Sequence, residues 1–169
     1  TSDSPYASFG YGYKARVAME EQRWEDVIVP LKTAQAMNPR QDMVYDWLGL
    51  YYFQKNSLDL ALLNFRKAYR YCSFDDSRHL MKAALTLYQM GRLEESAKTY
   101  QFIRKRFPKE GDLYTNLLMT YELLGRPEEA IGLVEKAMRL DPPPYADDYA
   151  LSLGLAYYLA GRYEEAIAP

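Results

Sequence analysis

The chain has 169 residues, 49% of them hydrophobic and 26% charged, so it has enough apolar side chains for a buried core and enough charge to keep its surface hydrated. Its 21 basic and 23 acidic residues leave a net charge of −2, so no overall field attracts it to nucleic acid or to an anionic membrane. The single cysteine, Cys72, excludes an internal disulfide, and the most apolar stretch, residues 151–160, is about half as long as a membrane-spanning helix.

The two ends of the sequence indicate a fragment. The first residue is Thr1 and not methionine, no secretory signal pattern follows it, and Pro169 falls inside a predicted helix. We therefore expect a soluble piece of a longer protein without direct membrane insertion. A lone thiol fits the cytoplasm and the periplasm nearly equally well.

The sequence repeats itself at intervals of about 34 residues, a length typical of stacked helix pairs. One set of equivalent positions, at spacings of 34, 35, 34 and 36 residues, contains Gln22, Asn56, Gly91, Gly125 and Gly161. Another set closes successive repeats and contains Pro39, Ser73, Pro108 and Pro142. These patterns predict one array of about four and a half repeats, at residues 8–41, 42–75, 77–110, 111–144 and, truncated, 147–169.

The first two repeats depart most from the pattern. Gln22 and Asn56 replace the glycine at the turn between two helices, and asparagine tolerates the left-handed conformation that such a turn requires. Pro30 falls several residues inside the second helix of its repeat, where its missing N–H should bend the helix. Cys72 stands where a helix should end, and we interpret it as a small, partly buried residue.

The third repeat opens with charged and polar side chains. Arg78 and Lys82 are four residues apart, so they share one face of the predicted helix. We interpret His79, the only histidine, as a surface or helix-cap residue, because no histidine pair or triad can form within the chain. The sequence therefore predicts no metal site, no cofactor and no catalytic residue.

The fourth repeat shows the predicted helix pair most clearly. Apolar residues spaced i, i+3, i+4 and i+7 between Tyr114 and Tyr121 form one helical stripe. Gly125 should end that helix in a left-handed cap, and Pro127 should begin the next one. The fifth repeat starts in the same way, with Gly161 at its turn.

These positions carry a resemblance to a known family. The run Tyr114-x2-Leu117-x3-Tyr121-x3-Gly125-x4-Ala130-x6-Ala137-x4-Pro142 resembles the tetratricopeptide repeat, as do runs that begin at Leu48-Gly49 and Leu153-Gly154. The resemblance extends over residues 8–169 and implies an all-α fold, an α-α superhelix (solenoid) of stacked antiparallel helix pairs. It also implies a protein–protein interaction scaffold, not an enzyme, with a concave face lined by the first helix of each pair.

The face of each first helix opposite its packing stripe should point into this concave groove, and it is rich in apolar residues. We expect a partner to contact Tyr13, Arg16, Trp47, Leu50, Phe53, Arg78, Lys82, Leu85, Tyr88, Asn116, Met119, Leu155 and Tyr158. Because an exposed apolar strip normally marks a binding surface, the expected partner is an apolar or amphipathic protein segment. Arg16, Arg78 and Lys82 would then pair with its acidic groups. Alternatively, neighbouring helices or missing segments bury the same side chains.

Two other functions fit the sequence. The chain can be a self-associating structural or assembly module that forms a homo-oligomer, or a docking or regulatory arm of a larger enzyme or envelope export assembly. Members of the family that grip acidic chaperone C-termini also carry a basic pair in the third repeat, as Arg78 and Lys82 do here. Gly12 and Trp47, however, replace the lysine and asparagine of that carboxylate clamp.

Overall fold

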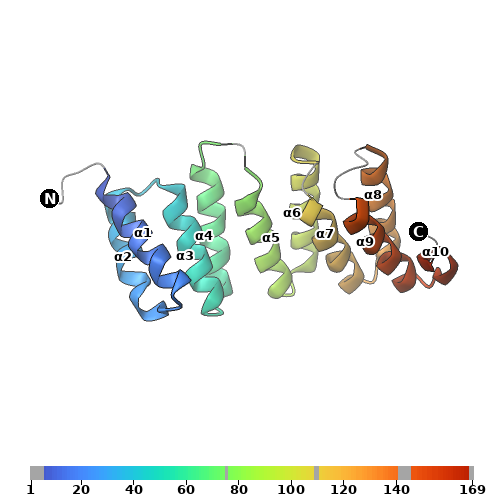
Figure 1. Ribbon diagram of the computed structural model, residues 1–169, viewed down its shortest axis with the longest axis horizontal. Helices are drawn as coiled ribbons and strands as arrows, with labels where there is room; N and C mark the ends of the chain where they lie inside the picture. Colours follow the sequence, from blue (N-terminus) through green and yellow to red (C-terminus); the bar gives the residue numbers. More distant parts are fainter. Residues whose placement is uncertain (1–5, 75, 109–110, 141–145, 168–169) are drawn as a thin grey trace. The chain divides into compact units, whose positions relative to one another are not determined.

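A computed structural model of the chain describes residues 6–74, 76–108, 111–140 and 146–167. These residues form helices and turns without any strand, which confirms the predicted all-α fold. The elements, labelled in Figure 1, are α1 (Ala7–Glu20), the 3₁₀ helix η1 (Trp24–Asp26), α2 (Ile28–Met37), α3 (Asp42–Gln54), α4 (Leu58–Tyr71), α5 (Arg78–Gln89), α6 (Leu93–Arg106), α7 (Gly111–Leu123), α8 (Pro127–Leu140), α9 (Ala146–Leu159) and α10 (Tyr163–Ile167). Pro142, the predicted end of the fourth repeat, lies outside the described residues.

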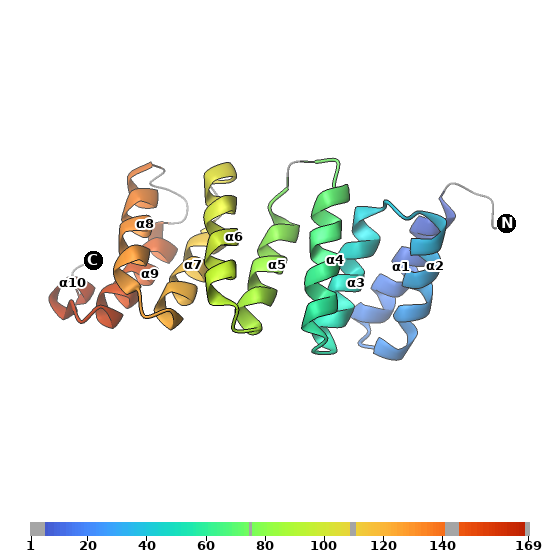
Figure 2. The same ribbon diagram turned by 180° about the vertical axis from the view of Figure 1, so that it is seen from behind.

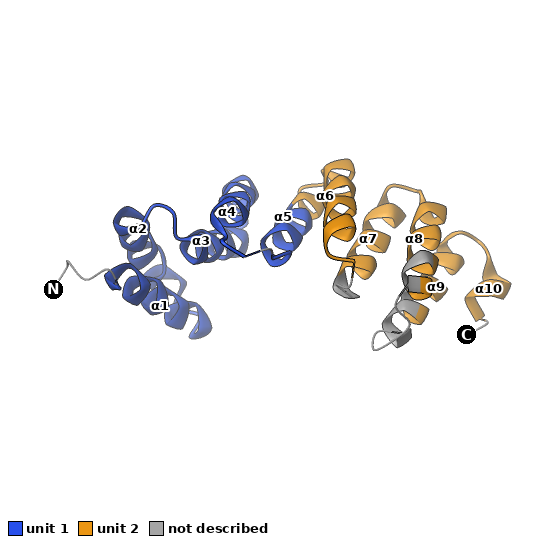
Figure 3. Ribbon diagram, turned by 90° about the horizontal axis from the view of Figure 1, so that it is seen from above, with its two compact units in different colours: residues 1–86 blue, residues 87–169 orange. Residues whose placement is uncertain are grey.

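The helices gather into two compact units, unit 1 (Thr1–Thr86) and unit 2 (Leu87–Pro169), coloured separately in Figure 3. In unit 1, α1 packs on α2 and α3 packs on α4 as antiparallel pairs, and α3 also contacts α1 and α2. Figure 2 shows α2 and α4 in front of the first helices of their pairs. In unit 2, α7 packs against α6, α8 and α9, and α9 packs against α10. Stacked helix pairs are thus confirmed within each unit.

The turns between paired helices follow the predicted column of positions. Positive φ angles of 55° to 74° occur at Gln22, Asn56, Gly91, Gly125 and Gly161. At each turn the next residue donates its N–H to a carbonyl five residues back, as Arg126 does to Tyr121 at 2.8 Å. Together with the bond from Gly125 to Glu122 at 2.9 Å, this is the hydrogen-bond pattern of a Schellman motif. The repeat therefore sets where each first helix ends.

The prediction that Pro30 bends a helix is wrong. The 3₁₀ turn at Trp24–Asp26 precedes α2, which begins only at Ile28. Pro30 therefore lies in the first turn of α2, where a backbone N–H would have no partner inside the helix. The proline is accommodated by a late helix start.

The core of unit 1 depends on two close approaches between helices. A Cβ atom at Gly12 of α1 would lie 2.5 Å from the Trp47 ring of α3, and one at Gly49 would lie 2.5 Å from the Phe65 ring of α4. Glycine is needed at both points because such distances are shorter than any van der Waals contact. Trp47 and the fully buried Leu48 belong to the resulting core. Among the described residues, no helix is both long and apolar enough to cross a lipid bilayer.

Candidate binding groove in unit 1

A groove with a volume of about 600 Å³ opens in unit 1, and we call it the unit 1 groove. Its walls come from α1, α3, the start of α5 and the connection between α4 and α5. The lining residues are Phe9, Arg16, Asp42, Met43, Asp46, Trp47, Cys72, Phe74, Asp76, Arg78, His79 and Lys82. The wall combines apolar rings with both signs of charge, and it lies on the side of α3 that meets the start of α5.

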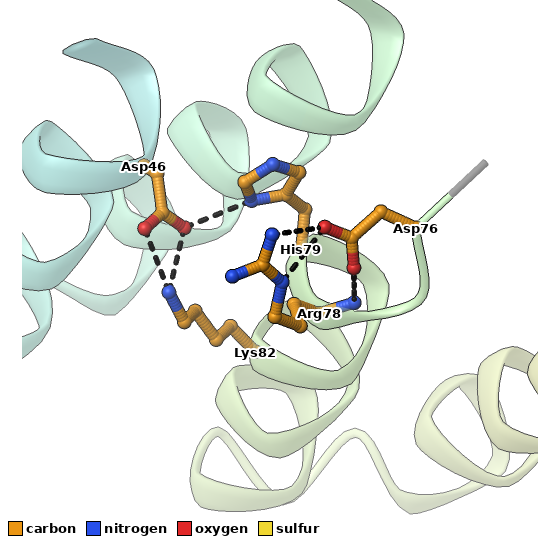
Figure 4. A network of polar contacts seen from close by, with 5 residues as sticks. All are labelled: Asp46, Asp76, Arg78, His79 and Lys82. Carbon is orange, nitrogen blue, oxygen red and sulfur yellow. Dashed lines mark hydrogen bonds and ion pairs between the residues drawn. The ribbon is translucent and has the colours of Figure 1, made fainter. Parts of the chain in front are cut away.

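A half-buried carboxylate, Asp46, joins α3 to α5 in this wall. His79 Nδ1 lies 2.9 Å from Asp46 Oδ1, and Lys82 Nζ donates to both Asp46 oxygens at 2.8 and 2.7 Å (Figure 4). Burial alone would raise the pKa of the Asp46 carboxyl. The hydrogen bonds from His79 and Lys82 and the charge of Lys82 outweigh burial and hold that pKa below its ordinary value. Asp46 is therefore ionised and compensated.

A second carboxylate caps the start of α5. Asp76 Oδ1 accepts the backbone N–H of Arg78 at 2.9 Å, and Asp76 Oδ2 accepts from Arg78 Nε at 2.7 Å. The hydrogen bond from the guanidinium is the main cause that lowers the pKa of Asp76. The Arg78 side chain is nevertheless 78% exposed, so it can reach a ligand while it stays paired.

The fold of the chain and its repeated turns are those of a known family. The sequence model of the tetratricopeptide repeat matches residues 81–143 and 124–169, which together make up more than half of the chain. The chain belongs to the tetratricopeptide repeat family. Repeats of this family serve as protein–protein interaction scaffolds, and its members are generally not catalysts.

Solved tetratricopeptide repeat structures share the fold at low sequence identity. A MamA protein superimposes with a TM-score of 0.78 at 17% identity, covering 97% of this chain and 88% of that one. PilF of Pseudomonas aeruginosa gives 0.73 at 22% identity, covering 95% and 72%. YrrB, described as a TPR protein with an unusual peptide-binding site, gives 0.69 at 16% identity, covering 93% and 79%. A search of curated proteins finds no match.

The structure brings four of the predicted partner-binding residues together in the unit 1 groove: Arg16, Trp47, Arg78 and Lys82. Trp47 is only 8% exposed, so most of its ring belongs to the core, and the Tyr13 ring meets it edge to face at 5.8 Å. Leu50 is half-buried against the unit 1 core, and Phe53 is also half-buried. The groove therefore uses one side of α3, and Leu50 and Phe53 lie outside its lining.

The remaining predicted residues are spread over three first helices. Leu85 and Tyr88 lie on α5, Asn116 and Met119 on α7, and Leu155 and Tyr158 on α9. Four of them are large apolar side chains with substantial exposure: Leu85 at 38%, Met119 at 41%, Leu155 at 46% and Tyr158 at 60%. Tyr88 and Asn116 are half-buried. Apolar area is thus accessible on each of these helices.

The interpretation of His79 as a surface or cap residue is wrong. The residue is 7% exposed, because its imidazole turns toward α3 and bonds to Asp46. Sequence reasoning also missed Asp42, Phe74 and Asp76 as groove residues. The available signal was Ser73, which stands where the other repeats have a closing proline and so marks an unusual connection to α5.

The predicted cationic residues already have partners within the chain. Arg16 pairs with Glu20 at 2.9 Å, Arg78 with Asp76, and Lys82 with Asp46. A ligand carboxylate would have to share these cations with the chain's own acids. The groove is therefore close to electrically neutral. Because Arg78 and Lys82 are both paired with acids of the chain, they do not offer two free cations that could clamp the acidic terminus of a partner.

Proposed function

We propose that this chain is a protein–protein interaction scaffold that holds an apolar or amphipathic segment of a partner protein against its first helices. The unit 1 groove carries the proposal, because it sets the accessible rings of Phe9 and Phe74 beside Trp47 in a space of about 600 Å³. That volume fits one or a few side chains of a docked peptide. The peptide-binding site named for the similar YrrB structure supports the same class of ligand.

The balance of charge in the groove favours apolar over acidic partners. Each cation in the wall is paired within the chain, so the favourable free energy of binding would come mainly from burying apolar area, at about 25 cal/mol per Å² before association costs. Arg78, which is highly exposed, would fix the direction of the bound segment through its guanidinium.

A peptide selection followed by matched variants tests this proposal. A random peptide library is selected on the immobilised chain, and the best binder is titrated by fluorescence polarisation. We expect Phe9→Ala with Phe74→Asp, which removes two of the rings that line the unit 1 groove, to weaken binding more than tenfold. Leu63→Asp on α4 is the control, since Leu63 is also an exposed apolar side chain but does not line the unit 1 groove. Unchanged affinity in the folded double variant, or loss in the control alone, would reject the site.

Self-association is a second candidate, favoured by the apolar exposure of the last helices. Leu151 is 78% exposed and Ile167 is 82% exposed, on α9 and α10. Two copies could bury these side chains against each other. Light scattering over a range of concentrations tests the idea: a mass that rises in the native chain and stays monomeric in Leu151→Asp supports it, and a constant monomeric mass rejects it.

A further inference from the structure

Three side chains of kinds that bind transition metals converge at one end of the unit 1 groove. A carboxylate oxygen of Asp42, the Sγ of Cys72 and an imidazole nitrogen of His79 lie within 4.8 Å of one another. They come from three places in the sequence: the first residue of α3, the residue that caps the end of α4, and the first turn of α5. The fold, and not a local motif, assembles them.

We propose that Asp42, Cys72 and His79 form a binding site for Zn²⁺ or a similar borderline-soft divalent metal ion. One thiolate, one imidazole and one carboxylate suit zinc and cobalt, whereas calcium and magnesium prefer oxygen ligands alone. A tetrahedral zinc ion holds such ligand atoms about 3.5 Å apart, so the ligand atoms, which lie within 4.8 Å of one another, need to close by about 1.3 Å at most. Three protein ligands leave the fourth position to water.

The hydrogen bond from His79 to Asp46 prepares the imidazole for this role. Asp46 Oδ1 lies 2.9 Å from Nδ1, and a carboxylate oxygen accepts a hydrogen bond there, which leaves Nε2 as the ring nitrogen available to a ligand. In Figure 4 the other ring nitrogen of His79 points away from Asp46. A carboxylate behind a ligating histidine fixes its tautomer and strengthens it as a donor. Asp46 is thus a positioning residue and not a metal ligand.

Charge around the cluster also fits a dication. Lys82 is neutralised by Asp46 and Arg78 by Asp76, which leaves the Asp42 carboxylate and the Cys72 sulfur to balance the metal. Burial raises the pKa of the Cys72 thiol, and the nearby Asp42 charge adds to the rise, so the thiol is protonated when no metal is bound. A coordinating metal displaces that proton to solvent and binds the thiolate. All three ligands line the groove, which gives the ion a route from solvent.

Bound metal would hold the ends of three helices together. Asp42 and His79 belong to α3 and α5, and Cys72 directly follows α4, so coordination would link the three helices and unfolding would have to break that link. Zinc should therefore raise the thermal unfolding temperature of the chain. Once the zinc concentration exceeds the dissociation constant, the rise should grow with the logarithm of that concentration. Alternatively, the cluster serves only as a hydrogen bond between the Cys72 thiol and Asp42. In that case zinc would not change the unfolding temperature.

Cobalt titration of the untagged, reduced chain tests the site. Since the sequence has one cysteine and one histidine, a near-ultraviolet thiolate-to-cobalt band can come only from Cys72. We expect the band to reach its end point at one cobalt per chain, with visible bands of tetrahedral intensity, and zinc to displace it. Cys72→Ser should abolish the band and the zinc-induced rise in unfolding temperature while the far-ultraviolet circular dichroism stays native.

Three further variants separate ligand, positioning and bystander roles. Asp42→Asn should weaken cobalt binding more than tenfold, and Asp46→Asn should weaken it by about 10- to 100-fold with the thiolate band retained at saturation. Asp59→Asn, an exposed carboxylate on α4, should leave the titration unchanged. The proposal is overturned by absence of the thiolate band, by equal zinc stabilisation of Cys72→Ser, or by sedimentation that shows metal binding only in a dimer.

Discussion

Unit 1 and unit 2 use the same helix-turn-helix repeat with different side chains at its variable positions. In unit 2 each turn has a glycine with positive φ, followed by an arginine that pairs with a glutamate three residues later, as Arg126 does with Glu129. In unit 1 the turns use Gln22 and Asn56. Unit 1 also places charge between helices, where Asp46 of α3 bonds to residues of α5.

The difference follows the match to the tetratricopeptide repeat. The family's sequence model covers residues 81–169 and so falls mainly on unit 2. A helix pair that only packs against its neighbours needs little beyond the consensus, and departures from it in unit 1 coincide with the groove and its polar cluster. Local disagreement with a repeat pattern is therefore a useful guide to where a scaffold binds.

The largest effect should come from removing the carboxylate that joins α3 to α5. Asp46→Ala leaves the buried imidazole of His79 and the ammonium of Lys82 without their acceptor, so we expect the free energy of unfolding to fall by about 2 kcal/mol. Urea unfolding in the presence of a chelator measures it. Glu25→Ala, an exposed carboxylate of η1, should change stability by less than about 0.5 kcal/mol. Equal losses in both variants would contradict the structural role of Asp46.

Two glycines of the same helix provide a matched test of packing in unit 1. Gly12→Ala forces a Cβ against the Trp47 ring, so overpacking should outweigh the gain in helix propensity and lower stability by about 1–2 kcal/mol. Gly10→Ala has open space around its Cβ and should raise stability by about 0.5–1 kcal/mol. Thermal unfolding of both variants compares them. Stabilisation by Gly12→Ala would show that α1 and α3 are not in close contact.

The sequence predicts the regular part of this molecule well and the site only in part. Spacing identifies the turn column, from Gln22 to Gly161, because left-handed caps leave a glycine or asparagine in four of the five repeats and the interval of about 34 residues places Gln22 in the first. It identifies Arg16, Trp47, Arg78 and Lys82 as residues of one surface because helical periodicity places them on first-helix faces. Periodicity describes faces of helices, however, and contains no information on pairing between them.

The residues that the sequence analysis missed make contacts between different repeats, which helical periodicity does not predict. His79 pairs with Asp46 from the preceding repeat, 33 residues away, and no local pattern distinguishes that partner from solvent. Asp42 and Cys72 lie at the two ends of a helix pair, and they meet His79 only because the connection to α5 brings all three together. Contacts that depend on connections between repeats require coordinates.

Substitutions at the turns should change the free energy of unfolding by an intermediate amount, and they compare a turn of unit 1 with a turn of unit 2. Gln22→Gly removes a side chain from a residue whose φ is 58°, so we expect a gain of about 1 kcal/mol. The reverse change in unit 2, Gly125→Ala at φ 66°, should cost about 1 kcal/mol. Chemical denaturation measures both free energies. If Gln22→Gly is neutral or destabilising, the glutamine side chain makes a contact that compensates for the backbone conformation.

The smallest effect should come from the surface ion pairs that follow the turns of unit 2. Arg126 pairs with Glu129 and lies over the Tyr121 ring, but its guanidinium is exposed to water. Water and salt screen such a pair, and holding two long side chains in one geometry offsets most of the attraction. Arg126→Gln should therefore leave the urea midpoint unchanged at both low and high salt. A shift as large as that of Asp46→Ala would mean that surface pairing stabilises unit 2 as strongly as the polar cluster stabilises unit 1. The two units would then differ in sequence but not in how strongly their charged side chains stabilise them.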